Sequence, residues 1–527
     1  MSDAARGGRP RQFNLASFFL DRNLEEGRGG RVALYCGEAQ TTFAELAGLA
    51  NRAGHALRWL GVERGDRVLL ALGDSPAFVA AWFAVVKIGA VVAEVYTFLQ
   101  PKDYAYTLNY GGAKVVVADA ATLDKLRSVR PECPDLQHIL VVGPADELGP
   151  GEASWDALTG QAPAELDPAP TTADDIALWK FTTGSTGAPK AAVHRHWDPV
   201  ASFENYGRGV LGLVVSDRVL PVPKLFFGYG RDLAALFNFG VGAAGVIFPE
   251  RSTPERLFEL IERNRPTILV QVPTMINEMA SHPDAGRYDL SSLRLCTSAG
   301  EALPPNVHAK WQRAFGVEIV DGIGSSELYH IYLSNRPGAA RRGSLGRLAP
   351  GYQAQIVGRD GQPLPDGETG ELRVAGESAA VVYWNDPEKS ARTFAGRWVN
   401  TGDLFRRDAD GYYWYQGRAD DLLKVGGIWV APVEVENCLG EHPAVAECAV
   451  IGVDEAGLAQ TRAYVVLLPG QPPDEDLATA LQAFVRARLA PHKAPRQVIF
   501  VDELPKTASG KLDRKALKQE AAGRAPV

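Results

Sequence analysis

A run of glycines and hydroxyl-bearing residues, TTGSTGAPK, occupies positions 182–190 and contains the groups that bind phosphate. Backbone N–H groups and hydroxyls donate to phosphate oxygens, and Gly184 and Gly187 let the backbone approach them closely. The run is not the P-loop of NTPases, in which two glycines are separated by four residues and the second glycine is followed directly by Lys and then Ser or Thr. Ala188 and Pro189 separate Gly187 from Lys190 here. The loop therefore indicates a different phosphate chemistry.

Four further motifs follow in order along the chain. They are DGIGSSE (321–327), NTGDLFRRDADGYYWYQGR (400–418), DDLLKVGG (420–427) and PKTASGK (505–511). Together with the first run they resemble the adenylate-forming superfamily, which includes acyl-CoA ligases, carrier-loading adenylation domains and luciferases. Five motifs in the same order cover nearly the whole chain, which makes the resemblance specific.

The resemblance implies that a carboxylate attacks the α-phosphate of ATP and displaces pyrophosphate. Both reactants are anionic, so the site must offset their repulsion and align them. Lys190 would supply positive charge or pin the loop. The residues implied to bind the phosphates are Thr182, Thr183, Gly184, Ser185, Thr186, Gly187 and Lys190.

The second motif and a nearby strand end are implied to bind the rest of the nucleotide. Glu327 is expected to bind Mg²⁺ that bridges phosphate oxygens, and Ser326 keeps the hydroxyl that the superfamily has beside it. The segment SAGEAL (298–303) resembles the strand end that contacts adenine through its backbone. The residues expected around adenine are Gly300, Glu301, Ala302, Asp321 and Gly322.

The third motif is expected to bind the ribose. Asp403 resembles the aspartate that accepts both ribose hydroxyls, and the two acceptor oxygens of a carboxylate suit a vicinal diol. Arg418 resembles the arginine that holds the ribose or phosphate side.

The last two motifs imply a mobile C-terminal domain. Lys511 resembles the lysine that swings over the site and bridges the carboxylate and the α-phosphate, where negative charge gathers in the transition state. Gly427 resembles the glycine that leaves room for the pantetheine arm of CoA, and Asp420 resembles the hinge residue. Thr182, Glu327 and Lys511 are thus the expected catalytic residues, and one small domain would serve both half-reactions.

A more specific resemblance is to the benzoate-CoA ligases and related aryl-CoA ligases. It rests on KLFFGYG (224–230), CTSAGEALP (296–304), DGIGSSELYHIYLSN (321–335), YWNDPEKS (383–390) and LAPHKAPR (489–496). It implies a flat pocket for an aryl ring, with Tyr229 and Phe237 as walls, Ile323 and Gly324 as floor, and His330 near the carboxylate or a ring substituent. Aromatic and apolar walls suit such a ligand.

Short apolar strands that alternate with helices must position these motifs. Strands are predicted at 67–73, 90–96, 114–119, 138–143, 176–181, 267–272, 293–298 and 317–322, with helices after Thr42 and over 76–88. The alternation predicts an α/β fold of parallel sheets covered by helices. The opening run follows the 176–181 strand, and ligands bind where such strands end.

The pattern changes after about residue 340, where Asp-Gly turns between short strands predict antiparallel hairpins. We therefore expect an adenylation domain over 1–417, with a β-rich part at about 340–417. A small mobile α/β domain is expected over 418–527, with its hinge near residue 420.

Composition limits the partners. The 527 residues are 46% hydrophobic and 22% charged, with a net charge of −8, which argues against nucleic-acid and membrane-surface binding. Five scattered cysteines and no apolar leader favour the cytoplasm. The expected partners are an aryl acid, ATP and CoA, with the chain as a monomer or homodimer.

Three other functions stay open at this stage. The acceptor of the acyl group could be the phosphopantetheine of a separate carrier protein in place of CoA. A non-catalytic nucleotide-binding module is disfavoured because Asp403 and Lys511 are both present. A luciferase-type oxygenase shares the adenylation step, and nothing in the sequence favours it.

Overall fold

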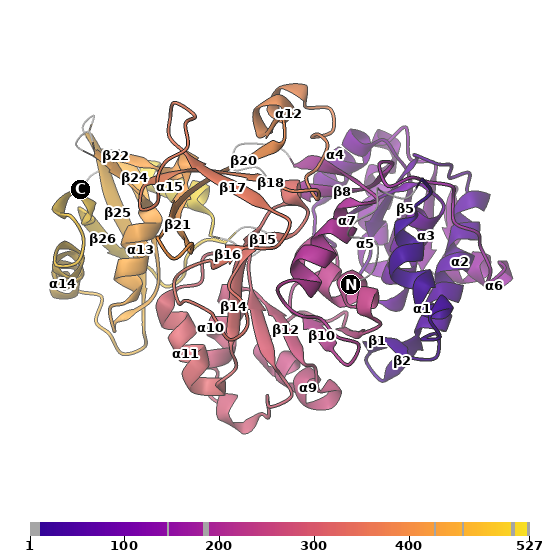
Figure 1. Ribbon diagram of the computed structural model, residues 1–527, viewed down its shortest axis with the longest axis horizontal. Helices are drawn as coiled ribbons and strands as arrows, with labels where there is room; N and C mark the ends of the chain where they lie inside the picture. The colour runs from indigo at the N-terminus through magenta and orange to yellow at the C-terminus, as the bar shows by residue number, and fades with distance from the viewer. Residues whose placement is uncertain are drawn as a thin grey trace.

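The computed structural model describes residues 11–144, 147–182, 189–425, 428–455, 458–506 and 512–523. In this part of the chain, two large sheets with helices between and around them are followed by an antiparallel sheet and a small C-terminal α/β unit (Figure 1). The predicted α/β class, with a β-rich part and a smaller C-terminal part, is confirmed.

The first large sheet has the strand order β7-β6-β5-β3-β4-β8-β9. All neighbouring strands are parallel except β8 and β9, which are antiparallel. Its strands are β3 (Arg67–Ala71), β4 (Val91–Glu94), β5 (Ala113–Asp119), β6 (His138–Val142), β7 (Glu152–Ser154), β8 (Ile176–Thr182) and β9 (Lys190–Arg195). Its central strands are buried on both faces, as their continuous apolar sequences predicted.

The second large sheet has the order β16-β15-β14-β13-β12-β10-β11-β1-β2. Its middle strands, from β14 to β1, are parallel, and antiparallel hairpins close both edges. Its strands are β1 (Val32–Cys36), β2 (Ala39–Thr42), β10 (Arg218–Pro221), β11 (Ala244–Ile247), β12 (Ile268–Gln271), β13 (Leu295–Ser298), β14 (Ile319–Gly324), β15 (Ile331–Ser334) and β16 (Arg347–Leu348).

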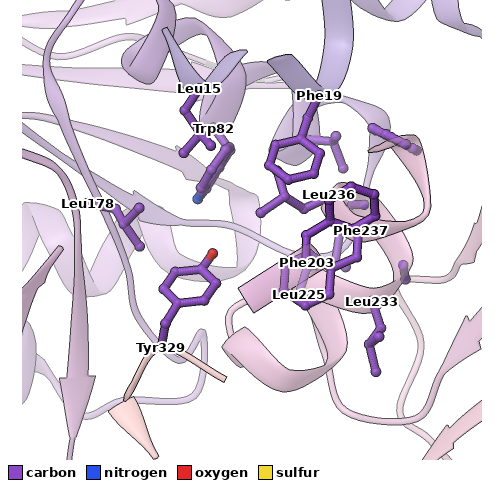
Figure 2. Packing of buried hydrophobic residues seen from close by; sticks show 14 of the residues in the cluster. Leu15, Phe19, Trp82, Leu178, Phe203, Leu225, Leu233, Leu236, Phe237 and Tyr329 are labelled. Carbon is purple, nitrogen blue, oxygen red and sulfur yellow. The ribbon is translucent and has the colours of Figure 1, made fainter. Parts of the chain in front are cut away.

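A shared core fills the space between the two sheets. Successive strand residues point to opposite faces, so Val68 and Leu70 enter this core while Leu69 and Ala71 face the outer helices. Figure 2 shows part of the shared core, where aromatic and leucine side chains from separate segments pack together. The longer helices are α2 (Phe43–Trp59) and α3 (Pro76–Lys87) in this core, α4 (Pro101–Gly111) and α5 (Ala120–Val129) outside the first sheet, and α9 (Pro254–Asn264), α10 (Pro273–Ser281) and α11 (Pro305–Phe315) outside the second.

Local sequence signals set the ends of these helices. Thr42 and Glu45 form the predicted capping box at the start of α2, each bonding the backbone N–H of the other. Ser75 caps α3, and Pro76 occupies its first turn, where a missing N–H costs nothing.

The antiparallel sheet lies above the second large sheet in Figure 1. Its strands are β17 (Gln353–Val357), β18 (Thr369–Ala375), β19 (Phe394–Ala395), β20 (Trp398–Arg407) and β21 (Tyr413–Arg418). The Asp-Gly turns fall between strands as predicted. Gly411 has φ of 82° in the β20–β21 turn, a conformation that glycine adopts without strain.

The C-terminal unit has a core of its own. One face of the β24-β25-β26 sheet packs on α13 and α14, and the opposite face packs on α15. Its elements are β22 (Leu423–Val425), β23 (Ile428–Val430), α13 (Pro432–Gly440), β24 (Val445–Glu455), β25 (Leu458–Leu467), α14 (Glu475–Arg486), β26 (Gln497–Phe500) and α15 (Arg514–Gly523). Among all the described helices, none has the length and apolar content needed to cross a membrane.

Candidate active site

One cavity of about 210 Å³ lies where strands of both large sheets end. Its lining includes residues that follow or end β4 and β8 in the first sheet, and β13 and β14 in the second. The carboxyl ends of parallel strands are where ligands bind in open α/β sheets. The two sheets therefore bring the first two sequence motifs to one site.

The run that is expected to bind phosphate lies between β8 and β9. Thr182 is the last residue of β8, lines the cavity and pairs with Lys190 at the start of β9. The ammonium of Lys190 lies 3.2 Å from the carboxylate of Asp386, so Lys190 pins the base of the hairpin. Thr183, Gly184, Ser185, Thr186 and Gly187 lie outside the described residues.

Glu327 sits in a 3-10 turn, Ser326–Leu328, directly after β14. The hydroxyl of Tyr383 donates to Oε1 of Glu327 at 2.5 Å and so fixes the carboxylate. His194 approaches the carbonyl of Ser326 with Nε2 at 2.7 Å and Asp198 with Nδ1 at 3.0 Å. The turn is thereby attached both to β9 and to the antiparallel part of the chain.

The backbone after this turn adopts an uncommon conformation. Tyr329 has φ of 72° and ψ of −54°, and the N–H of His330 donates to the carbonyl of Leu328 at 2.9 Å. This is a γ-turn with φ in the region that side chains disfavour. The ammonium of Lys180 holds it by donating to the Tyr329 carbonyl at 2.6 Å.

The five residues expected around adenine lie in two places. Gly300, Glu301 and Ala302 follow β13, and Asp321 and Gly322 lie in β14. Gly300 lines the cavity with φ of 96°, and Ala302, two residues further along the chain, is exposed. Glu301 accepts a bond from the Thr274 hydroxyl at 3.3 Å. Gly322 pairs within the sheet with Ser334.

Asp321 is a buried carboxylate whose Oδ1 has no hydrogen-bond partner. Burial raises its pKa to about 7, although the Ser298 hydroxyl and the Gly322 N–H act in the other direction. A buried acceptor of this kind suits a ligand group that donates hydrogen bonds.

The two ribose candidates form one ion pair. Asp403 and Arg418 face each other across the β20–β21 ladder, and Arg418 donates to Oδ1 of Asp403 at 3.1 Å. The pairing raises the pKa of Arg418 against the opposing effect of burial. The arginine orients the carboxylate that is expected to accept the diol.

The acid-pocket candidates are only partly brought together. Tyr229, Gly324 and His330 line the cavity, and the Tyr229 hydroxyl lies 2.6 Å from Oγ1 of Thr297. Phe237 is fully buried behind His330, with ring centroids 4.9 Å apart, and belongs to the aromatic packing of Figure 2. Ile323 pairs with Leu333 and, like Phe237, is not part of the cavity lining that the structure describes.

The C-terminal candidates lie away from this cavity or outside the described part. Asp420 is exposed in the 3-10 turn Ala419–Asp421. Lys511 and Gly427 lie outside the described residues. The cavity lining that the structure describes runs from Glu94 to Ile331, so it includes no C-terminal residue.

Comparison with known proteins assigns the chain to a family. Residues 20–384 match the AMP-binding enzyme family, and residues 434–511 match the AMP-binding enzyme C-terminal domain. The chain belongs to the AMP-binding enzymes, the adenylate-forming superfamily that its motifs resemble.

Individual relatives are similar over nearly their whole length. The chain is 43% identical over 512 residues to a benzoate–CoA ligase of Thauera aromatica, covering 97% of this chain and 96% of that protein. It is 39% identical to a 4-hydroxybenzoate–CoA/benzoate–CoA ligase of Rhodopseudomonas palustris, covering 97% and 95% respectively. The crystal structure of an anthranilate CoA ligase in complex with anthranoyl-AMP has a TM-score of 0.93, at 40% identity over 99% of each chain.

Several residues at the site carried no sequence signal. His194 and Asp198 hold the Glu327 turn, yet they lie about 130 residues before it. Lys180, Arg231 and Glu94 line the cavity from three separate elements. Among these residues, only Lys180 could have been noticed in the sequence, because it is a lysine inside the otherwise apolar strand 176–181.

Asp321→Asn should change how stability depends on pH. The folded state raises the pKa of Asp321 to about 7 from 3.8, so its contribution is most favourable at low pH and is lost as pH rises toward 7. From pH 5 to pH 8 the wild type should lose about 2 to 3 kcal/mol relative to the variant. Thermal unfolding at both pH values measures this, with exposed Asp476→Asn as the control. Parallel pH profiles of the wild type and Asp321→Asn would contradict the raised pKa of Asp321.

Proposed function

We propose that this chain is an ATP-dependent aryl-acid–CoA ligase. It activates a benzoate-like acid as the acyl-adenylate with release of pyrophosphate, then transfers the acyl group to CoA and releases AMP. The observation that carries the proposal is the single cavity that joins Thr182, Gly300 and Ser326 to Tyr229 and His330. Residues suited to a nucleotide and residues suited to an aryl acid thus face the same space.

The phosphates of ATP would lie at the β8–β9 hairpin. The Thr182 hydroxyl and the loop from Thr183 to Gly187 would donate to them, with Lys190 holding the hairpin to Asp386. Such donors would replace the hydration of the phosphates. The aryl acid would enter beside Tyr229 and His330, which places its carboxylate next to the α-phosphate.

Glu327 fits a magnesium ion. Across the described residues, no three His, Cys, Asp or Glu side chains form a metal cluster. Mg²⁺ often binds through one or two carboxylates, with phosphates and waters as its other ligands. When bound, it would neutralise charge on the phosphate oxygens. Tyr383 would keep the Glu327 carboxylate oriented for it.

The C-terminal part would act as a mobile domain. We place the division at residues 1–417 and 418–527, with the hinge at the exposed Asp420. Lys511 would enter the site for adenylation, and the segment with Gly427 would enter it for the attack of the CoA thiol. The acceptor is CoA, because the relatives described above are CoA ligases by name, which disfavours the carrier-protein alternative.

The reducing cytoplasm is the compartment that we propose. All five cysteines are unpaired, and disulfides are rare where glutathione and thioredoxin keep thiols reduced. Whether the chain acts as a monomer or a homodimer stays a prediction.

Exchange of labelled pyrophosphate into ATP tests the proposed function directly. We expect exchange that depends on an aryl acid chosen from benzoate and its hydroxy, amino and halo derivatives, with acetate as the control. Adding CoA should convert the same acid to the aryl-CoA and ATP to AMP. If none of the aryl acids supported exchange, the assignment would be wrong.

Tyr383→Phe should weaken magnesium use. The ring would still pack on Phe394, with centroids 5.3 Å apart, but the bond to Glu327 would be lost. We expect the Mg²⁺ concentration for half-maximal exchange to rise about 10-fold or more. Tyr412→Phe is the matched control, because Tyr412 is a half-buried tyrosine in the β20–β21 turn whose hydroxyl donates to the carbonyl of Ala339, away from Glu327. An unchanged Mg²⁺ dependence would remove Tyr383 from this role.

Lys511→Ala should separate the two half-reactions. Loss of the bridging ammonium should slow adenylation on the order of 10²- to 10³-fold, while CoA thioester formation from a supplied aryl-adenylate should persist. The control is Lys506→Ala in the same motif, since Lys506 lies 3.8 Å from Glu447. Equal loss of both half-reactions would contradict the two-state cycle.

A further inference from the structure

One wall of the cavity comes from the segment between β10 and α8 (Gly228–Asp232). Four consecutive residues of this segment, from Phe226 to Tyr229, line the cavity. The two residues directly before them, Lys224 and Leu225, are not part of the cavity lining that the structure describes. Whatever anchors these two residues therefore decides where the wall stands.

Asp74 anchors the segment to the first sheet. It lies in the connection from β3 to α3 and is 3% exposed, and its Oδ1 accepts from the backbone N–H of Leu225 at 2.9 Å. The Leu225 side chain packs into the shared core, where Figure 2 labels it. The carboxylate thus bonds the backbone directly before the four residues of the wall.

Lys224 anchors the segment to the second sheet. Its ammonium donates at 2.7 Å to the carbonyl of Phe248, the residue after β11, and lies 3.3 Å from the centre of the Phe248 ring. The same ammonium lies 3.9 Å from Oδ2 of Asp74, which has no hydrogen-bond partner among the described residues. One carboxylate and one cation, facing each other, therefore tie adjacent residues of the segment to opposite sheets.

Burial opposes the charge on both groups. It raises the pKa of Asp74 to about 6, against the effects of Lys224 and the Leu225 N–H, and it lowers the pKa of Lys224 to about 8, against the effect of Asp74. The two groups are therefore charged together only between about pH 6 and pH 8. Packing alone does not account for such a pair, since apolar residues of similar size are often as stabilising.

Three further groups face the pair. Glu250 favours the charged form of Lys224 and Arg256 opposes it, and these two pair with each other at 2.8 Å. Cys36, at the end of β1, is the third. Burial, Glu250 and Asp74 raise the pKa of its thiol, so Cys36 stays neutral between pH 6 and pH 8.

We propose that Asp74 and Lys224 are positioning residues that hold the wall from Phe226 to Tyr229 in place for the aryl acid, and that they do so best while both are charged. The inference rests on the proposed function. Charge-assisted contacts are roughly twice as strong as neutral ones. A wall that is only partly in place lowers the apparent affinity for the acid in proportion.

The first test is the pH dependence of the KM for the acid in the wild type. Pyrophosphate exchange with the benzoate that supports the fastest exchange is measured from pH 5.5 to pH 9. We expect this KM to be lowest between about pH 6 and pH 8 and to rise about 5-fold on either side. His330 does not cause this rise, because burial lowers its pKa to about 3. The KM for ATP, measured at each pH, should not follow the same curve.

Two variants assign the two sides of the curve. Lys224→Arg keeps a cation that holds its proton throughout this range, so the rise above pH 8 should disappear while the rise below pH 6 remains. Asp74→Asn keeps an acceptor for Leu225 but carries no charge, so the KM for the acid should be raised about 5-fold at pH 7 and the rise below pH 6 should be lost.

Lys114→Arg and Asp66→Asn are the matched controls. Lys114 and Asp66 are a partly buried pair 2.9 Å apart where β5 and β3 begin, at the opposite end of the first sheet from the cavity. Both control variants should keep the wild-type curve.

The outcomes separate this inference from the ligase assignment. If the KM for the acid does not change with pH in the wild type, or if the KM for ATP changes in parallel, the inference is wrong and the ligase assignment stands. A rise above pH 8 that persists in folded Lys224→Arg would also contradict it. If no aryl acid supports exchange, the ligase assignment fails and the inference fails with it.

Discussion

The site depends on the buried carboxylate of Asp232. It joins β8 through Lys180 and the γ-turn after β14 through Tyr329, and it neutralises Arg231 beside it in α8. Breaking a buried ion pair by removing one partner costs several kcal/mol because it leaves an uncompensated charge. The strained backbone at Tyr329 persists because this network determines its position. The geometry of the cavity therefore rests on one electrostatic arrangement between the two sheets.

Much of the fold followed from the sequence because its signals are local. The apolar strands, the capping box at Thr42 and the Asp-Gly turns each depend on a few neighbouring residues. The residues of the site could be predicted from the sequence only where they lie inside a recognisable motif. Tyr229 and His330 do line the cavity, whereas Phe237, taken from the same resemblance, packs one layer behind it. How deeply a side chain lies in the core depends on how distant segments of the chain pack together. The spacing of residues in one sequence does not show this.

The residues that sequence reasoning missed act over long separations. His194 holds a turn that begins at Ser326, and Glu94 meets Arg231 across the interface of two sheets. Neither pair has a periodicity or a motif that could reveal it.

Gly228 limits which substitutions the ring-binding end of the cavity can accept. The ammonium of Lys180 occupies the space that a side chain at position 228 would fill. An alanine there would displace the lysine side chain from its partners, and a small neutral residue in place of the lysine would leave room for the alanine. The two positions are thus coupled sterically in one direction: a side chain at position 228 needs room that the lysine now occupies, whereas a smaller residue at position 180 needs no change at the glycine.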